Sequence, residues 1–372
     1  MGNNKQSKPM QREIGSNFWL NPYETLKEYP IGSPEQFSCQ GKDYSWLSTG
    51  RSAIRLAIRD IEAKRPSIKK IAVLPSFTCD TVFEPFLKAG YDVYYYSVDE
   101  WLRTTSDSIL KTVYEHDASI VLFHRFFGFD TLDGQVDKMC EYLRQSGKYS
   151  IEDCTQCLYS DIGRAEADYT IGSIRKWTGT PDGGFAVCRD GLFTQKPYQT
   201  DKVLEAAKVK ASYAKYHYLF EQQGEKDNML AMFRQAEDIL DQQTDFFAIS
   251  ETSSKVQSNL NFLDLKIKRR ANYSILLNNI HAPIKTLFSV RNEGNVPLYF
   301  PLYVENRLSL QKHLVQNAIY APVVWPKSDL QPRVCAEAEN AYEHLLCIPI
   351  DQRYDEDDMF RIVDVINKYY CQ

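Results

Sequence analysis

The hydrophobic positions of the chain follow two periodicities from about residue 47 onward. Short apolar runs, typical of buried strands, stand between longer segments whose apolar residues recur every three or four positions, as on one face of a helix. The predicted strands are Ile71–Leu74, Asp92–Val98, Ser119–Phe123 and Tyr149–Ile151, and the predicted helices are Ser52–Lys64, with Ser52 as its cap, Thr81–Ala89 and Val136–Gln145. Strands that alternate with helices predict a mostly parallel sheet covered by helices on both faces.

The pattern changes near residue 200. Charged segments with helical periodicity cover Asp201–Gln222 and Asn228–Phe246, and shorter strand-like pieces then lead to a closing helix, Asp355–Tyr370. A chain of 372 residues that is 43% hydrophobic is long enough to form two cores. We therefore predict an N-terminal segment (1–45), a large α/β domain (46–245) and a smaller C-terminal α+β domain (246–372).

Composition and charge narrow the choice of partners. The net charge is −5, which argues against nucleic acid as a partner. No apolar stretch approaches the roughly 18 residues that span a bilayer, and the first fifteen residues lack the apolar segment of a signal peptide. The nine cysteines are scattered, several of them inside apolar runs, as is usual for reduced thiols. We expect a cytoplasmic protein without a bound metal or a membrane partner.

Polar residues stand where three of the predicted strands end. The turn Ser48–Ser52 contains a glycine and leads straight into a helix, whose free N–H groups suit a phosphate but also fit a simple helix cap. Asp153 follows a buried strand, where a carboxylate needs a partner, in a cofactor or in a structural ion pair. Lys176 lies in the turn SIRKWTGTPDGG between two apolar runs. In a parallel sheet such positions meet at one edge.

Together these three features match the needs of one cofactor, pyridoxal 5'-phosphate. An amine such as that of Lys176 can bond to its aldehyde, a carboxylate can hold a proton on its ring nitrogen, and a helix N-terminus can bind its phosphate. The order and spacing of the three along the chain make the combination more specific than any one of them. A dinucleotide-binding or Walker-type nucleotide site is excluded, because neither glycine motif is present.

The same segments resemble the DegT/DnrJ/EryC1/StrS family of sugar aminotransferases, which belong to fold type I of the pyridoxal-phosphate enzymes. The resemblance runs from about residue 45 to residue 370. The matching segments are TGRSAIRLAI, LPSFTCDTVFEPFLKAGYDVYYYSVD, IVLFHRFFGFD, IEDCTQCLYS, SIRKWTGTPDGGFAV, IYAPVVWP and LLCIPIDQRYDEDDM. The resemblance implies an α/β fold with a mostly parallel central sheet and a smaller C-terminal domain.

The resemblance also implies roles for particular residues. Lys176 corresponds to the lysine that bonds to the cofactor and moves protons, Asp153 to the partner of the ring nitrogen, and Gln156 to the contact with the 3-oxygen of the ring. The residues that correspond to phosphate contacts are Gly50, Arg51, Ser52 and Ser173.

Some positions depart from the family pattern, and others carry no firm role. Cys79 occupies the place where many relatives stack an aromatic ring on the cofactor, so we expect Phe77 or Phe127 to supply that surface. The segment by which relatives reach into a neighbouring subunit is missing around 205–235, where Tyr213, Lys215 and Tyr216 are the candidates. Further candidates, each with an equal or better explanation in packing or ion pairing, are His124 near the cofactor, Arg125 and Arg175 for a substrate carboxylate, and Tyr320 and Trp325 for the sugar.

The implied activity is transfer of an amino group from an amino acid, glutamate or glutamine, to a keto-sugar that is often nucleotide-linked. Two alternatives remain open at this point. The related sugar dehydratases have a histidine in place of Lys176, and a non-catalytic protein could keep the fold for binding alone. The resemblance further implies a homodimer, because sites of this fold are completed by a second subunit.

Overall fold

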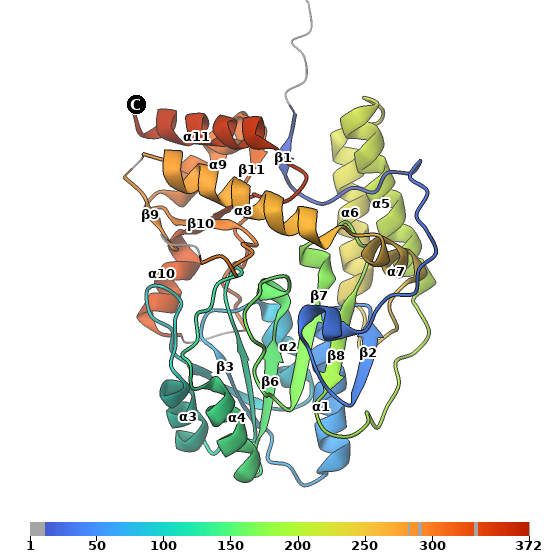
Figure 1. The fold of residues 1–372 in the computed structure, drawn as a ribbon, viewed down its shortest axis with the longest axis vertical. Coiled ribbons are helices and arrows are strands. Elements are labelled where there is room, and N and C mark those ends of the chain that lie inside the picture. Colours follow the sequence, from blue (N-terminus) through green and yellow to red (C-terminus); the bar gives the residue numbers. More distant parts are fainter. Residues whose placement is uncertain (1–11, 282, 289–291, 331–333, 372) are drawn as a thin grey trace, which may run out of the picture.

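The computed structural model describes residues 12–281, 283–288, 292–330 and 334–371. Its centre is a seven-stranded sheet with the strand order β2-β8-β7-β6-β5-β3-β4 (Figure 1). The strands are β2 (Asp43–Leu47), β3 (Ile71–Pro75), β4 (Asp92–Tyr96), β5 (Ile120–His124), β6 (Tyr149–Asp153), β7 (Tyr169–Ser173) and β8 (Gly184–Cys188). Only β8 runs against the others among these seven strands, being antiparallel to both β2 and β7. The predicted mostly parallel sheet is therefore confirmed.

Alternation along each strand places helices on both faces. In β3, Ala72 and Leu74 pack into one core with helices α1 (Gly50–Lys64) and α2 (Asp80–Lys88), whereas Val73 packs into another core. That second core includes apolar residues of α3 (Ser106–Glu115) and α4 (Val136–Gln145). Strands buried on both sides require apolar residues at successive positions, which is the pattern in the sequence.

The second core continues into the C-terminal domain. This domain has a small antiparallel sheet in the order β12-β10-β9, on which the helices shown at the top of Figure 1 gather. Its elements are α8 (Phe262–Asn279), β9 (Lys285–Thr286), β10 (Phe300–Tyr303), α9 (Arg307–Gln316), β11 (Ile319–Tyr320), α10 (Ala336–His344), β12 (Leu345–Ile348) and α11 (Glu356–Tyr370). The predicted closing helix is confirmed to within one residue.

Two further parts border the site. Helices α5 (Lys202–Phe220) and α6 (Lys226–Asp241) form a helical pair, and the short α7 (Glu251–Ser258) follows them (Figure 1). The N-terminal segment crosses toward the C-terminal domain, where β1 (Ile14–Gly15) pairs in parallel with β11. No helix in the described ranges is both long and apolar enough to cross a bilayer.

Candidate functional site

Six of the seven strands of the central sheet end at one edge, and the polar residues that follow them meet there. His124 ends β5, Asp153 ends β6 and Ser173 ends β7, with His124 in register opposite Asp153. A cavity of about 400 Å³ lies at this edge, which we call the strand-end cavity. Of the eight predicted site residues it is lined by seven: Gly50, Arg51, Cys79, Asp153, Gln156, Ser173 and Lys176.

Lys176 ends a single turn of 3₁₀ helix (Ile174–Lys176) between β7 and β8. The two neighbouring positions are fixed, because Ile174 and Trp177 are completely buried. Lys176 itself is exposed, and its amine makes no hydrogen bond or ion pair with any other described residue. A rigid turn thus presents a free amine, and it does so in the wall of the strand-end cavity.

Asp153 and its neighbour Glu152 point in opposite directions, as successive residues of a strand must. Glu152 is buried and pairs with the guanidinium of Arg125, so it is the structural ion pair of this strand. Asp153 lines the cavity and accepts a hydrogen bond of 2.8 Å from the backbone N–H of Thr155. Burial raises the pKa of the Asp153 carboxyl to about 6, because no cation forms an ion pair with it within the described chain. A ligand that carries a positive charge here would restore the ionised form.

Gln156 and His124 complete the polar lining beside Asp153. The side-chain oxygen of Gln156 accepts a bond of 2.8 Å from the N–H of Phe127, which leaves its amide nitrogen as the group that can donate to a ligand. The Nε2 atom of His124 lies 3.2 Å from the hydroxyl of Thr78. Burial lowers the pKa of His124 to about 4, so the ring is neutral at physiological pH.

The N-terminus of α1 reaches the same cavity through Gly50 and Arg51. The predicted cap at Ser52 is wrong: Thr49 is the N-cap, and its hydroxyl accepts from the N–H of Ser52 at 3.0 Å. Apolar periodicity could not choose between the hydroxyl residues Ser48, Thr49 and Ser52 as the cap, because none of the three is apolar. The hydroxyl of Ser52 is held by Ser48 and Thr49, and Ser52 does not line the cavity. The N–H groups of Gly50 and Arg51 have no partner within a helix that begins at Gly50.

The space at this helix end fits a phosphate group. A Cβ atom added at Gly50 would lie 3.4 Å from the Cβ of Ser173 and 3.9 Å from the hydroxyl of Thr155, so the glycine keeps the cradle open. Ser173 donates to the carbonyl of Gly183 at 3.1 Å, and its oxygen can still accept. The arrangement of free N–H groups, a helix N-terminus and two hydroxyls is of the kind that binds phosphate. The residues present therefore fit pyridoxal 5'-phosphate, with Lys176 and Asp153 at its reactive end and its ring.

The aromatic surface of the cavity differs from the expectation. Phe77 and Phe127 are almost completely buried in the core and do not line the cavity, so neither can stack on a ligand there. Trp325, from the C-terminal domain, lines the cavity instead, with its ring 6.3 Å from that of Phe127 and nearly parallel to it. Cys79 also lines it, and burial raises the pKa of its thiol. The sequence motif around Cys79 does not reveal a tryptophan that lies some 250 residues away.

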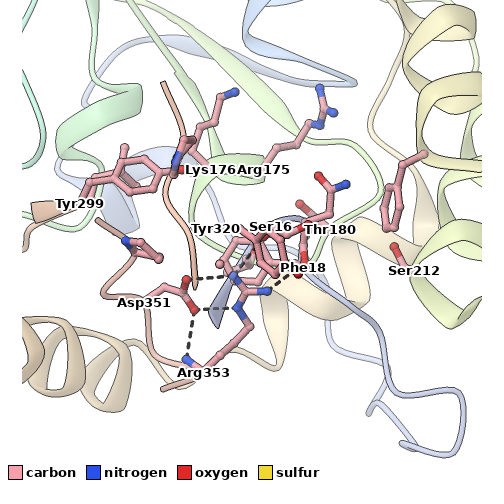
Figure 2. Close-up of a pocket in the computed structure, with 18 of the residues that line it drawn as sticks. Ser16, Phe18, Arg175, Lys176, Thr180, Ser212, Tyr299, Tyr320, Asp351 and Arg353 are labelled. Atoms are coloured by element: carbon pink, nitrogen blue, oxygen red, sulfur yellow. Dashed lines mark hydrogen bonds and ion pairs between the residues drawn. The ribbon is translucent and has the colours of Figure 1, made fainter. Parts of the chain in front are cut away.

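A second cavity, of about 490 Å³, adjoins the first. We call it the N-terminal cavity, because Gly15–Phe18 form part of its wall. Figure 2 shows Arg175 and Lys176 at one end of it and the ion pair of Asp351 with Arg353 toward the other. The residues common to the walls of both cavities are Arg175, Lys176, Glu237, Leu298, Tyr299 and Pro322. Lys176 therefore stands where the two cavities meet.

The remaining predicted residues divide between the cavities and the scaffold. Arg175 lines both cavities and pairs with Glu237 of α6 at 3.0 Å, and Tyr320 lines the N-terminal cavity. Arg125 serves only the scaffold, through Glu152 and Asp130. Tyr213, Lys215 and Tyr216 line neither cavity of their own chain, and their reach into a second subunit stays a prediction.

Sequence reasoning missed Glu237, Tyr299 and the residues of the N-terminal segment. Glu237 and Tyr299 come from α6 and from the loop before β10, which carry no motif, and Ser16 and Phe18 lie in a segment without regular periodicity. Glu237 is half exposed on α6, outside the buried face of that helix, so no local pattern in the sequence marks it as a site residue.

Comparison with known proteins identifies the fold. The sequence matches no protein-family model and no curated protein. Solved structures of the same fold include the sugar aminotransferase CalS13 from Micromonospora echinospora, with 16% identity, a TM-score of 0.60 and 87% of each chain covered. Another is the aminotransferase PseC of Helicobacter pylori, involved in the biosynthesis of pseudoaminic acid, with 12% identity, a TM-score of 0.65, and 91% of this chain and 89% of that chain covered.

A third similar structure is a DegT DnrJ EryC1 StrS aminotransferase from Brucella abortus, with 16% identity, a TM-score of 0.60 and 92% of each chain covered. The chain thus has the fold of these aminotransferases over nine-tenths of its length, as the resemblance of its motifs predicted. At such identities the likeness establishes the fold, and the chemistry has to be argued from the site.

Proposed function

We propose that the protein is a pyridoxal-phosphate-dependent aminotransferase that moves an amino group from an amino acid, glutamate or glutamine, to a keto-sugar, which is nucleotide-linked. One observation carries the proposal. The free amine of Lys176, the buried carboxylate of Asp153 and the open N-terminus of α1 line a single cavity of about 400 Å³. The similar solved structures are aminotransferases, among them a sugar aminotransferase, and this supports the same reaction.

Each residue has a defined task in this reaction. Pyridoxal phosphate, when bound, supplies an aldehyde and an electron-withdrawing ring. Asp153 would hold a proton on the ring nitrogen, and its burial would make that charge pair strong. Gln156 would donate from its amide nitrogen to the oxygen of the ring, and the N–H groups of Gly50 and Arg51 would bind the phosphate. The amine of Lys176 would attach the cofactor and would serve as the base that moves a proton at the substrate carbon.

The position of Lys176 between two cavities fits a transfer reaction. The strand-end cavity holds the cofactor-type residues, whereas the N-terminal cavity offers room on the other side of the same amine. A substrate in the N-terminal cavity can therefore reach Lys176 without displacing the phosphate from α1. Trp325 and Tyr299 add aromatic surface to the wall of the strand-end cavity.

The first experiment tests the cofactor and the amine together. Purified protein titrated with pyridoxal phosphate is expected to develop a visible absorbance band that Lys176→Ala abolishes and that the exposed-lysine control Lys210→Ala retains. The proposal is wrong if the wild type binds no cofactor, or if Lys176→Ala keeps the same band.

The second experiment separates transamination from the alternatives. With L-glutamate alone the band of the loaded wild type is expected to bleach in a single turnover with formation of 2-oxoglutarate, and a keto-sugar is expected to restore it. Lys176→Ala should slow the transfer by about 100-fold or more. Loss of water from the sugar without consumption of glutamate would indicate a dehydratase, and a coloured protein without either reaction would indicate a binding protein.

We further propose that the protein works in the cytoplasm as a homodimer. All nine cysteines are free thiols, and eight of them are at least partly protected from solvent: the buried Cys39, Cys140, Cys154, Cys157, Cys188 and Cys347 and the half-buried Cys79 and Cys335. Free buried thiols are usual in a reducing compartment. Light scattering coupled to size-exclusion chromatography measures the subunit number directly.

A further inference from the structure

Three of the nine free thiols lie together in a small core that borders the turn carrying Lys176. Cys39, Cys154 and Cys157 belong to this core, and at most 1% of each residue is exposed. The same core contains Trp177, which directly follows Lys176 in the chain. A chemical change among these thiols therefore acts on a core that holds part of the site in place.

Two of the three thiols are in contact. The Sγ atoms of Cys39 and Cys154 lie 3.9 Å apart, although the two residues are 115 positions apart in the sequence. Each thiol also donates to a backbone carbonyl, that of Phe37 at 3.6 Å for Cys39 and that of Ile171 at 3.1 Å for Cys154. The sulfurs of a disulfide are about 2 Å apart, so the pair has to close by about 2 Å. A side-chain rotation and a small shift of the loop before β2 can provide this movement.

The guanidinium of Arg164 lies against the same thiols. It donates to the Sγ atom of Cys157 at 3.1 Å and to the carbonyl of Phe37, two residues before Cys39, at 3.0 Å. Burial raises the pKa of the Cys154 thiol well above its usual range, and the charge of Arg164 acts in the opposite direction. A cation beside a sulfur stabilises the thiolate, which is the form that reacts with oxidants.

Cys39 is the thiol of the pair that an oxidant can reach first. It lies in the loop between the 3₁₀ turn Pro34–Phe37 and β2, and its neighbours Ser38 and Gln40 are exposed. Local opening of a surface loop costs far less free energy than global unfolding. Cys154 follows directly on β6, in the middle of the central sheet. The order of reaction is therefore Cys39 first and Cys154 second.

We propose that Cys39 and Cys154 form a redox pair, which a peroxide oxidises to a disulfide. The Cys39 thiolate attacks one oxygen of hydrogen peroxide and becomes a sulfenic acid, and the hydroxide that leaves takes the thiol proton to form water. The sulfur of Cys154 then attacks the sulfur of Cys39, and the hydroxyl that leaves takes the proton of Cys154 to form a second water. Two thiols and one peroxide thus give one disulfide and two waters, and a phosphine reductant reverses the change.

The disulfide acts on the site through the backbone around Cys154. This residue stands between Asp153 and Thr155, which both line the strand-end cavity and are joined by a hydrogen bond of 2.8 Å. The carbonyl of Thr155 also accepts from the indole N–H of Trp177 at 2.7 Å. Movement of Cys154 toward Cys39 strains both contacts, so the oxidised protein should bind pyridoxal phosphate several-fold more weakly. This consequence rests on the proposed function, whereas the disulfide does not.

Peptide mapping of the full-length protein tests the disulfide directly. Reduced protein is treated with hydrogen peroxide at pH 7, its remaining thiols are blocked with N-ethylmaleimide, and it is digested with trypsin without reductant. Trypsin releases Cys39 in the peptide 28–42 and both Cys154 and Cys157 in the peptide 149–164. We expect the two peptides to be joined after oxidation and to separate on reduction. Their absence as a joined species, under conditions that oxidise the exposed Cys371, overturns the redox pair.

A matched pair of variants assigns the bond. Cys39→Ser should abolish the joined peptides, whereas Cys157→Ser removes the other thiol of the peptide 149–164 and should keep them. Loss of the joined peptides in Cys157→Ser overturns the assignment to Cys154. Should a variant fail to fold, fragmentation of the joined wild-type peptides still identifies whether Cys154 or Cys157 carries the bond.

Absorbance titration with pyridoxal phosphate, before and after oxidation, separates this inference from the proposed function. Oxidised Cys39→Ser retains the cavity thiol Cys79 and should keep its affinity, so a loss confined to the wild type assigns the effect to the disulfide. An unaltered affinity in the oxidised wild type overturns the link to the site. A disulfide in a protein that takes up no pyridoxal phosphate supports the redox pair and overturns the aminotransferase.

Discussion

The buried carboxylate of Asp153 is predicted to destabilise the cofactor-free protein, and its replacement by asparagine should show this. The asparagine keeps the shape of the side chain and an oxygen that can accept from the N–H of Thr155. It removes only the negative charge, for which the described chain provides no ion pair. The variant therefore isolates the electrostatic cost of holding that charge ready for a ligand.

The magnitude follows from the pKa of Asp153, which burial raises from 3.8 to about 6. A carboxyl whose pKa is higher in the folded than in the unfolded state binds more protons when folded, so stability falls as pH rises from about 4 to about 6. Above pH 6 the full cost is present, and it amounts to about 3 kcal/mol. Asp153→Asn should be more stable than the wild type by up to this amount at pH 8, and the difference should vanish near pH 4.

The assay is urea unfolding of both proteins without cofactor between pH 4 and pH 8. Asp117→Asn is the control, and its effect on the free energy of unfolding should have the opposite sign. Lys69 and Lys148 lower the pKa of Asp117, so removing this carboxylate should destabilise the protein at neutral pH. Adding pyridoxal phosphate should reverse the order of the Asp153 pair, because the wild type gains more from a cationic ring than the variant does. A variant that is less stable than the wild type at pH 8 without cofactor would refute the reasoning.

Three further predictions rest on single contacts. Gly184→Ala should destabilise the protein by several kcal/mol and abolish cofactor binding, because the new Cβ would lie 2.3 Å from the backbone of Thr49. Urea unfolding measures the loss, with Gly163→Ala as the control, since a Cβ at Gly163 would have no other atom within 4 Å. Thr49→Ala should cost about 1 kcal/mol of stability through the lost helix cap and weaken cofactor affinity, as measured by absorbance titration. Burial lowers the pKa of His124 to about 4, so the folded protein favours the neutral ring. The free energy of unfolding should therefore fall as pH drops from about 6.5 to about 4, because the unfolded chain binds the proton first. NMR titration of the His124 ring measures the pKa directly.

The fold was largely predictable because its main signals are local. Helix α4 was predicted at its observed bounds, Val136–Gln145, since four apolar residues recur there at helical spacing. Strand ends were displaced by one or two residues, as for β6, which continues through the polar residues Glu152 and Asp153 to the edge of the sheet. Apolar patterning cannot detect an extension made of polar residues, although backbone pairing with β5 and β7 continues through them.

The half of the site on the central sheet was predictable for a different reason. Parallel strands deliver the residues that follow them to one edge, so Asp153 and Lys176 could be brought together from topology alone. Glu237 and Tyr299 could not, because they come from helix α6 and from the loop before β10, whose packing against the sheet depends on side-chain fit over long sequence separations. The cofactor-type residues thus follow from the sheet, whereas the substrate-side residues depend on tertiary packing.

Arg175 illustrates how a structural and a functional interpretation of one residue can both hold. Its ion pair with Glu237 ties the turn that carries Lys176 to helix α6, and by that criterion Arg175 is a scaffold residue. The same pair lines both cavities, and Glu237 shares its charge with Lys208. Because the Oε1 atom of Glu237 binds both cations, one carboxylate joins the turn that carries Lys176 to helices α5 and α6. The residue that fixes the position of the reactive turn is therefore also part of the wall on which a ligand of either cavity would lie.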